Sequence, residues 1–321
     1  MTDTGIGALG YVGYAKETTE ATAVAPTMFL AATRIEFPDS NDYNTPLLIQ
    51  GSRDVLVALQ APYSVTGTLE LPLPSMNIGY LLKSAFAATA ASSAYVGGGY
   101  THILTPGSAS DTFTFEKSAQ DVLIMRYTGI RVNTLQIKAA HGEIVSSTFG
   151  LDGIDRAKQA TPATPTYDAS VVNPFHFTRS KVTIAGADSS VVKDWTLNVN
   201  NNVTHVGTLR STRAYKRVAL GAREVGLSMT LDFVDTTEYD RLLNDSEFAV
   251  SLYMEAGTGV GAGGTSYQSL KLDLPRVRYK TVGLPINAGD LLSQDVECTV
   301  LKPVSGVIAT VTLVNNESSL A

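Results

Sequence analysis

The feature that most constrains this chain is a segment of strict alternation, residues 64–71, which reads Ser-Val-Thr-Gly-Thr-Leu-Glu-Leu. Successive side chains of a strand point to opposite faces, so this alternation predicts a strand with one buried face and one polar face. A break that contains prolines follows, and apolar residues then recur at helical spacing over residues 76–88. Ser75 is the expected N-cap of that helix.

The same order of elements returns in the second half of the chain. The strand pattern recurs at residues 227–233, and the helical pattern after it begins at Asp235 with Glu238 three residues on, the spacing of a capping box. The matching segments are 35–37 and 197–199, 68–71 and 230–233, 81–82 and 242–243, 123–127 and 270–274, and 142–146 and 289–293. They are 161–162 residues apart before a Gly-rich loop and 147 apart after it.

Matches that keep one order, with the change of length confined to a Gly-rich loop, predict an internal duplication. We expect an N-terminal arm (residues 1–30), a first domain (31–155), a linker (156–174) and a second domain (175–321). Two unrelated β-domains that share a generic alternation are the alternative. Different strand orders in the two halves would favour that alternative.

The composition is typical of a β-rich globular protein. Charged residues make up 17% of the 321 residues and the net charge is −6, so we expect no basic surface that holds nucleic acid. Cys298 is the single cysteine, which excludes an internal disulfide, and we expect both Cys298 and Trp195 to be buried. We recognise neither a signal peptide nor an apolar run long enough to span a membrane, so we expect synthesis in a cytoplasm.

No motif for catalysis, cofactor binding or metal binding is complete. The four histidines lack a second His or a Cys at ligand spacing, so we expect no metal site. Residues 5–10 spell GxGxxG, but too few residues precede them for the strand that a dinucleotide site requires, and we expect a flexible or docking arm instead. The sequence therefore predicts a protein that is not an enzyme and holds no cofactor.

Several segments together resemble the tail tube (major tail) proteins of long-tailed bacteriophages. They are residues 13–19, 25–27, 67–71 with the helix that follows, 100–102, 113–116, 127–133 and 273–277. The resemblance implies a mainly β fold with two tandem β-sandwich domains, each with one flanking α-helix, whose strands join between subunits into a large β-barrel ring. Single-domain members form six-fold rings, so a two-domain chain implies a ring of three chains with pseudo-six-fold symmetry.

The resemblance further implies a structural protein of the virion tail, assembled in the host cytoplasm. Its stacked rings would form a hollow tube through which double-stranded DNA passes without being held. The implied partners are further copies of the chain, a tape measure protein in the lumen, and tail terminator and distal tail proteins, with no membrane. The alternatives are a two-domain β-sandwich adhesin or carbohydrate-binding module, and another virion component such as a tail terminator.

The residues that would serve such a tube follow from the polar strand faces and the long loops. Because DNA is densely negative, a conduit benefits from a neutral to acidic lumen. The candidate lumen residues are Thr66, Thr68, Glu70, Asp152, Ser228, Thr230, Asp232, Asp295 and Glu297. The candidate inter-ring contacts are Tyr11, Tyr14, Asp39, Asp42, Arg53, Arg210, Arg213, Lys216 and Arg217. The cations near residues 210–223 permit two interpretations, a solvated hairpin or a contact with acidic groups of a neighbouring subunit.

Overall fold

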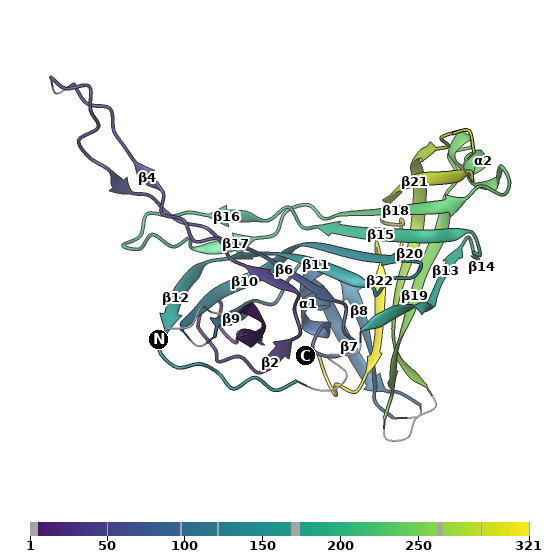
Figure 1. Ribbon diagram of the computed structural model, residues 1–321, viewed down its shortest axis with the longest axis horizontal. Coiled ribbons are helices and arrows are strands. Elements are labelled where there is room, and N and C mark those ends of the chain that lie inside the picture. The colour runs from purple at the N-terminus through teal and green to yellow at the C-terminus, as the bar shows by residue number, and fades with distance from the viewer. Residues whose placement is uncertain are drawn as a thin grey trace.

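The computed structural model describes residues 6–49, 51–96, 98–120, 122–167, 174–261, 266–289 and 291–320. The chain is mainly β, with large antiparallel sheets and two short α-helices, as the sequence predicted. The two halves lie side by side along the longest axis of the molecule (Figure 1).

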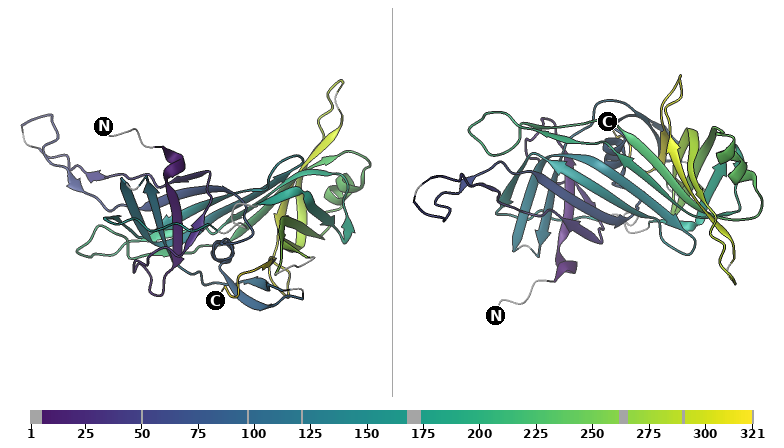
Figure 2. Two further views of the ribbon diagram at one scale, coloured as in Figure 1. Left: turned by 60° about the horizontal axis from the view of Figure 1, so that its bottom comes forward. Right: turned by 90° about the horizontal axis from the view of Figure 1, so that it is seen from above.

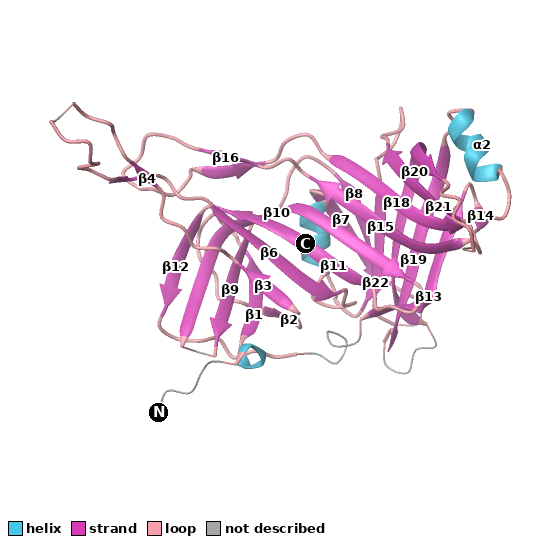
Figure 3. Ribbon diagram, turned by 45° about the horizontal axis from the view of Figure 1, so that its top comes forward, coloured by secondary structure: helices cyan, strands magenta, loops and turns pink. Residues whose placement is uncertain are grey.

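One long antiparallel sheet runs through both halves (Figure 3). In spatial order its strands are β3 (Arg34–Glu36), β6 (Val65–Pro72), β11 (Ser146–Gly153), the later part of β10 (Leu123–Ala140), β15 (Val192–Asn200), β18 (Glu224–Asp232), β21 (Ser293–Val300) and the later part of β20 (Tyr267–Gly283). The ladder between β10 and β15 joins the halves, with Ile137 opposite Leu197. The junction between the halves is therefore a strand pairing within one sheet.

A second layer of strands covers one face of the long sheet in each half. In the first half it consists of β2 (Met28–Leu30), β1 (Tyr11–Lys16), β9 (Phe113–Ala119), the early part of β10 and β12 (Asp155–Gln159). In the second half it consists of β14 (Ala187–Asp188), β13 (Phe175–Ile184), β19 (Phe248–Gly259), the early part of β20 and β22 (Thr310–Asn315). Since β10 and β20 each pass from one layer to the other, each half is a β-sandwich.

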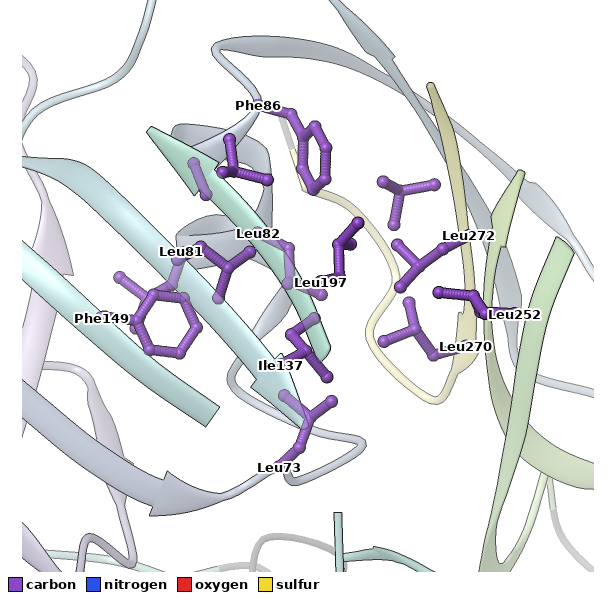
Figure 4. Close-up of a cluster of buried hydrophobic side chains, with 14 of the residues drawn as sticks. Leu73, Leu81, Leu82, Phe86, Ile137, Phe149, Leu197, Leu252, Leu270 and Leu272 are labelled. Atoms are coloured by element: carbon purple, nitrogen blue, oxygen red, sulfur yellow. The ribbon is translucent and has the colours of Figure 1, made fainter. Parts of the chain in front are cut away.

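The core lies between these layers. Alternate residues of the long sheet, among them Leu69, Phe149 and Leu197, are buried and face the core. In the first half, α1 (Gly79–Ala85) adds Leu81 and Leu82 to the same cluster (Figure 4). Trp195 and Cys298 are also buried, which confirms both predictions. The period of two in the strands is thus explained by burial of one face.

A hairpin of the first half completes the second half. It consists of β7 (Ala88–Ala94) and β8 (Tyr100–Pro106), follows α1, and pairs through β8 with β22. A buried hydrogen bond fixes this pairing, because His102 Nε2 lies 3.0 Å from Asn315 Oδ1. In the second half, α2 (Thr237–Leu243) leads directly into β19, whereas the β7–β8 hairpin follows α1 in the first half. This difference explains why the distance between matching segments falls from 161–162 to 147 residues.

The remaining elements are short. They are the 3-10 helix η1 (Gly7–Leu9) and two small ladders, β4 (Tyr43–Asn44) with β5 (Leu59–Gln60) and β16 (Thr204–Val206) with β17 (Arg217–Ala219). Both ladders belong to long segments, one from each half of the chain, that extend beyond the sandwich of the first half (Figures 1 and 2).

Two expected boundaries differ from the structure. Residues 11–30 are not an arm, because β1 lies between β2 and β9 as an interior strand of the sheet. The expected linker begins too early, because Asp155–Gln159 forms strand β12. Residues 168–173 of that linker lie outside the described residues. Both errors have one cause: the strand partners are distant in sequence, so local composition does not reveal the pairing.

The expected helix caps are also wrong. Ser75 is fully buried and lies before the helix, which begins at Gly79 after Ile78 without a side-chain cap. The second helix begins at Thr237, and Asp235 Oδ1 accepts a hydrogen bond of 2.8 Å from Thr237 N. Glu238 does not close a capping box, since its carboxylate binds Arg241 and Tyr279 instead.

The two halves pair their strands in corresponding registers. Leu135 of β10 lies opposite Phe149 of β11, and Val282 of β20 lies opposite Val296 of β21, each 147 residues later. A bulge interrupts the first ladder between Val132 and Thr134, two positions before Leu135. A bulge interrupts the second ladder between Tyr279 and Thr281, two positions before Val282. Such a bulge is a specific feature of a strand pair, so its presence at both positions relates the two halves closely.

The register also fixes how the neighbouring strands correspond. Leu69 of β6 lies opposite Phe149, and Met229 of β18 lies opposite Val296. The offset between β6 and β18 is therefore 160 residues rather than the 162 expected from sequence. A shift of two residues keeps every side chain on its face, so alternation alone cannot detect it.

Candidate functional site

All of the predicted lumen residues lie on the polar face of the long sheet. Thr66 is opposite Asp152, Thr230 is opposite Asp295, and the β10–β15 ladder carries the same face from one half to the other. Side chains of directly opposed residues share a face, so the remaining members follow from the same ladders. They are Thr68, Glu70, Ser228, Asp232 and Glu297.

Most cations on this face are paired with carboxylates. Arg34 Nη1 lies 3.2 Å from Glu70 Oε1, and Lys193 Nζ lies 2.5 Å from Asp232 Oδ1. Thr230 Oγ1 donates a hydrogen bond of 3.0 Å to Asp295 Oδ1. Arg34 and Lys193 are thus neutralised by carboxylates of the same face.

Asp152 differs from the other predicted lumen residues because it is covered. Its carboxylate lies 3.7 Å from His205 Nε2, on the β16 strand that follows β15. Burial raises the pKa of Asp152, while His205 and a hydrogen bond with Asn133 oppose that rise. The structure therefore places Asp152 under the β16–β17 ladder rather than on the open face.

Two long segments that carry most of the predicted inter-ring residues extend together past the sandwich of the first half (Figure 1). One is the loop 37–62, which contains β4 and β5, and the other is the hairpin 201–219, which contains β16 and β17. They touch where the end of the loop 37–62 meets the outer part of the hairpin: Tyr63 bridges Ala214, and Arg213 Nε donates a hydrogen bond of 2.7 Å to Ala61 O. The basic segment is thus a hairpin. Its contact with acidic groups of a neighbouring subunit stays a prediction.

The loop 37–62 exposes an unusual amount of apolar surface. Its exposed aliphatic side chains are Leu47, Leu48, Ile49, Val55, Leu56, Val57 and Leu59. Contiguous exposed apolar groups on a soluble protein mark a surface that another molecule covers. In sequence these apolar residues are strand-like, and they do not reveal that the loop leaves the sandwich.

The predicted inter-ring residues fall into two groups. Asp42, Arg53, Arg210, Lys216 and Arg217 are exposed on the two extended segments, as is Asp39, which pairs with Arg156 at 2.6 Å. Arg213 is partly covered by its contact with Ala61.

Tyr11 and Tyr14 lie in the core of the first half instead. Tyr11 Oη donates a hydrogen bond of 2.6 Å to Glu116 Oε1, and Tyr14 Oη donates one of 2.7 Å to Asn77 O. Tyr14 is fully buried, and this burial raises its pKa well above the ordinary value. The fully buried Tyr14 side chain is therefore not available to another ring.

Comparison with known proteins decides the family. The chain matches the family profile described as phage tail tube protein over residues 7–300, which is most of its length. This chain belongs to the phage tail tube protein family. No curated protein matches the tail tube chain. The predicted family and the mainly β sandwich fold are thereby confirmed.

Membership has direct consequences for this tail tube protein. The family is structural, and its members are components of the virion tail that assemble into a tube with other tail proteins.

Within the described part of the chain, no group of His, Cys, Asp and Glu is arranged to hold a metal ion. No helix among the described residues is long and apolar enough to cross a membrane.

Proposed function

We propose that this tail tube protein forms closed rings of three chains and that these rings stack into a hollow tube. The polar face of the long sheet lines the lumen of this tube, and double-stranded DNA passes through the lumen. The observation that carries the proposal is the long sheet itself. It has one continuous polar face, and it ends at open strand edges on both sides.

The open edges supply the contact between chains. Among the described residues, β3 pairs with β6 alone, and the part of β20 after Val277 pairs with β21 alone. An unpaired edge is a template for another strand. Because the two edges differ and lie at opposite ends of the sheet, they favour head-to-tail joining, which closes into a ring when the rotation permits.

The corresponding registers of the two halves support the number of chains. They favour a duplication, with a first domain up to β12 and a second domain from β13 onward. The resemblance to single-domain tube proteins in six-fold rings then implies three two-domain chains in each ring. The β10–β15 ladder would be one kind of junction in that ring, and the contact between chains would be the other.

The polar face suits a conduit. Its carboxylates and hydroxyls, including Glu70, Ser228 and Glu297, offer no cationic surface that would hold the DNA phosphates. A tape measure protein would occupy the same lumen before DNA passes. Tail terminator and distal tail proteins would contact the ends of the tube.

The extended segments would stack one ring on the next. Their exposed apolar and basic groups lie outside the sandwich, where another ring can cover them. The variant Leu56→Asp should leave folded protein that forms rings but few long tubes. Long tubes formed as readily as by the unaltered protein would exclude a stacking role for the loop 37–62.

Electron microscopy of the purified protein tests the whole proposal. We expect tubes whose averaged end-on views have three-fold symmetry with six similar density lobes around a central hole. Glu70 and Asp232 should face that hole. Six chains in each ring, or an outer-wall position for Glu70 and Asp232, would contradict the proposal.

A further inference from the structure

An apolar groove opens in the first half at the side where two edge strands lie together. It is the mouth of the sandwich between β2 and β3, with a cavity volume of about 610 Å³. Its apolar lining includes Val12, Leu30, Ala31, Ala32, Ile35 and Tyr167. A groove of this size can hold several side chains from another segment.

The corresponding mouth in the second half is already filled. It lies between β13 and β15 and has a cavity volume of only about 170 Å³, because Ala139, Ala140 and His141 from the end of β10 line it. His141 N donates a hydrogen bond of 3.0 Å to Lys193 O, and Ala139 lies opposite Trp195. The end of a strand from the first half thus closes the sandwich of the second half.

The strand registers identify the residues that correspond to this pair. Ile35 lies opposite Leu69 and Trp195 lies opposite Met229, so Ile35 holds the position of Trp195 at the 160-residue offset. Ala139 corresponds at the 147-residue offset to Ile286. Ile286 is 79% exposed, just after β20 ends.

We infer that segment 284–288 of a neighbouring copy of this chain occupies the groove, with its Ile286 opposite Ile35. The inference rests on the proposed ring and names the contact that closes it. It repeats between chains the arrangement observed within the chain at Ala139 and Trp195. Ala288 corresponds to His141 at the 147-residue offset, and Thr33 corresponds to Lys193 at the 160-residue offset. Ala288 N of one copy therefore donates a hydrogen bond to Thr33 O of the next.

The sizes of the paired side chains support this assignment. The pair within the chain combines a small and a very large residue, Ala139 and Trp195, whereas the pair between chains combines two of intermediate size. The total volumes are similar, so both mouths are filled. If Ala139 packed against Ile35, a void would remain beside Ile35, and if Ile286 packed against Trp195, the larger side chain would crowd it. Side-chain volume therefore distinguishes the two junctions.

Disulfide cross-linking tests the register. Side chains of directly opposed strand residues are close enough for a disulfide, so the variant Ile35→Cys/Ile286→Cys should give covalent dimers and trimers on a non-reducing gel after assembly. The matched control is Gln136→Cys/Asn198→Cys, an exposed pair within the chain whose side chains already share a hydrogen bond of 2.9 Å. It should form a disulfide that leaves the band at the monomer position.

The outcomes separate this inference from the proposed function. Tubes in which Ile35→Cys/Ile286→Cys gives no covalent oligomer would overturn the groove assignment and leave the tube intact. Wild-type protein that remains monomeric under assembly conditions would contradict the proposed function itself, and the groove assignment with it.

A second variant does not depend on oxidation. Ile286→Asp changes an exposed side chain, so the monomer should fold with unchanged unfolding behaviour. Burial of an Ile at the ring contact predicts at least a tenfold rise in the critical concentration for assembly when it is replaced by Asp. The control Val304→Asp, at a fully exposed site outside the groove contact, should assemble as the wild type does. Equal critical concentrations for Ile286→Asp and wild type would refute the inference.

Discussion

Glu116 on β9 offers a sharp test of how the first half is held together. Its carboxylate is fully buried and accepts hydrogen bonds from Tyr11 Oη at 2.6 Å and from Arg126 Nε at 2.9 Å. Ala163 N also lies 3.3 Å from Glu116 Oε1. One carboxylate therefore ties β1, β10 and the segment after β12 to the centre of the sheet.

The variant Glu116→Ala should cost about 3 kcal/mol of the free energy of unfolding, the lower end of the range for breaking a buried ion pair. The lower end applies because the Arg126 side chain is 18% exposed and retains some contact with water. Urea unfolding followed by circular dichroism, at a concentration below that for assembly, measures the loss. Since a buried pair is costly to break but not to replace, Glu116→Met/Arg126→Met should lose less than Glu116→Ala.

The matched control is Glu36→Ala, which removes one of the two exposed carboxylate partners of Arg34. Exposed ion pairs contribute little, so its free energy of unfolding should change by less than about 0.5 kcal/mol. If Glu116→Ala lost less than about 1 kcal/mol, the carboxylate would not anchor the first half in this way.

Three further predictions concern other parts of the molecule. Asn315→Ala removes the partner of His102 and of Ser75 O, so urea unfolding should show a loss of about 3 kcal/mol, and a loss under about 1 kcal/mol would refute the role of this contact. Arg276 and Arg278 lower the pKa of Glu247 to about 2, so the stability that the Glu247 carboxylate provides is present above its unfolded pKa and is lost as pH falls towards 2. Glu247→Gln should therefore make the melting temperature less sensitive to acid between pH 4.5 and 2. An unchanged dependence of the melting temperature on pH would contradict this. Glu297→Lys should leave unfolding and tube formation unchanged but give salt-dependent binding of short DNA to the tube, and tubes that bind DNA no better than wild type would argue against a lumen position.

The sequence identified the strands with a strict period of two because burial of one face leaves a local signature. Leu69, Phe149, Leu197 and Val296 all obey it. The same period does not reveal the register, because aligning β6 with β18 at an offset two residues larger leaves every side chain on the same face of the sheet. For this reason Glu70 corresponds in structure to Thr230, although the sequence match pairs it with Asp232.

The features that the sequence did not reveal depend on contacts distant along the chain. Tyr14 was expected on an exposed arm, but pairing with β9 places it in the core. The groove beside Ile35 exists because β2 and β3 are both edge strands, a property of the sheet order and not of any local segment. The shared polar face was predictable as alternation, whereas its continuity through β10 and β15 required the structure.

The hairpin of the first half also bears on the order in which the chain folds during synthesis. β8 leaves the ribosome long before its partner β22, since His102 and Asn315 are 213 residues apart. Until β22 emerges, β8 presents an unpaired edge that a nascent neighbour could capture. We therefore expect the second half to reach its final structure only after translation has passed β22, and crowded polysomes to be the setting in which this protein misassembles most readily.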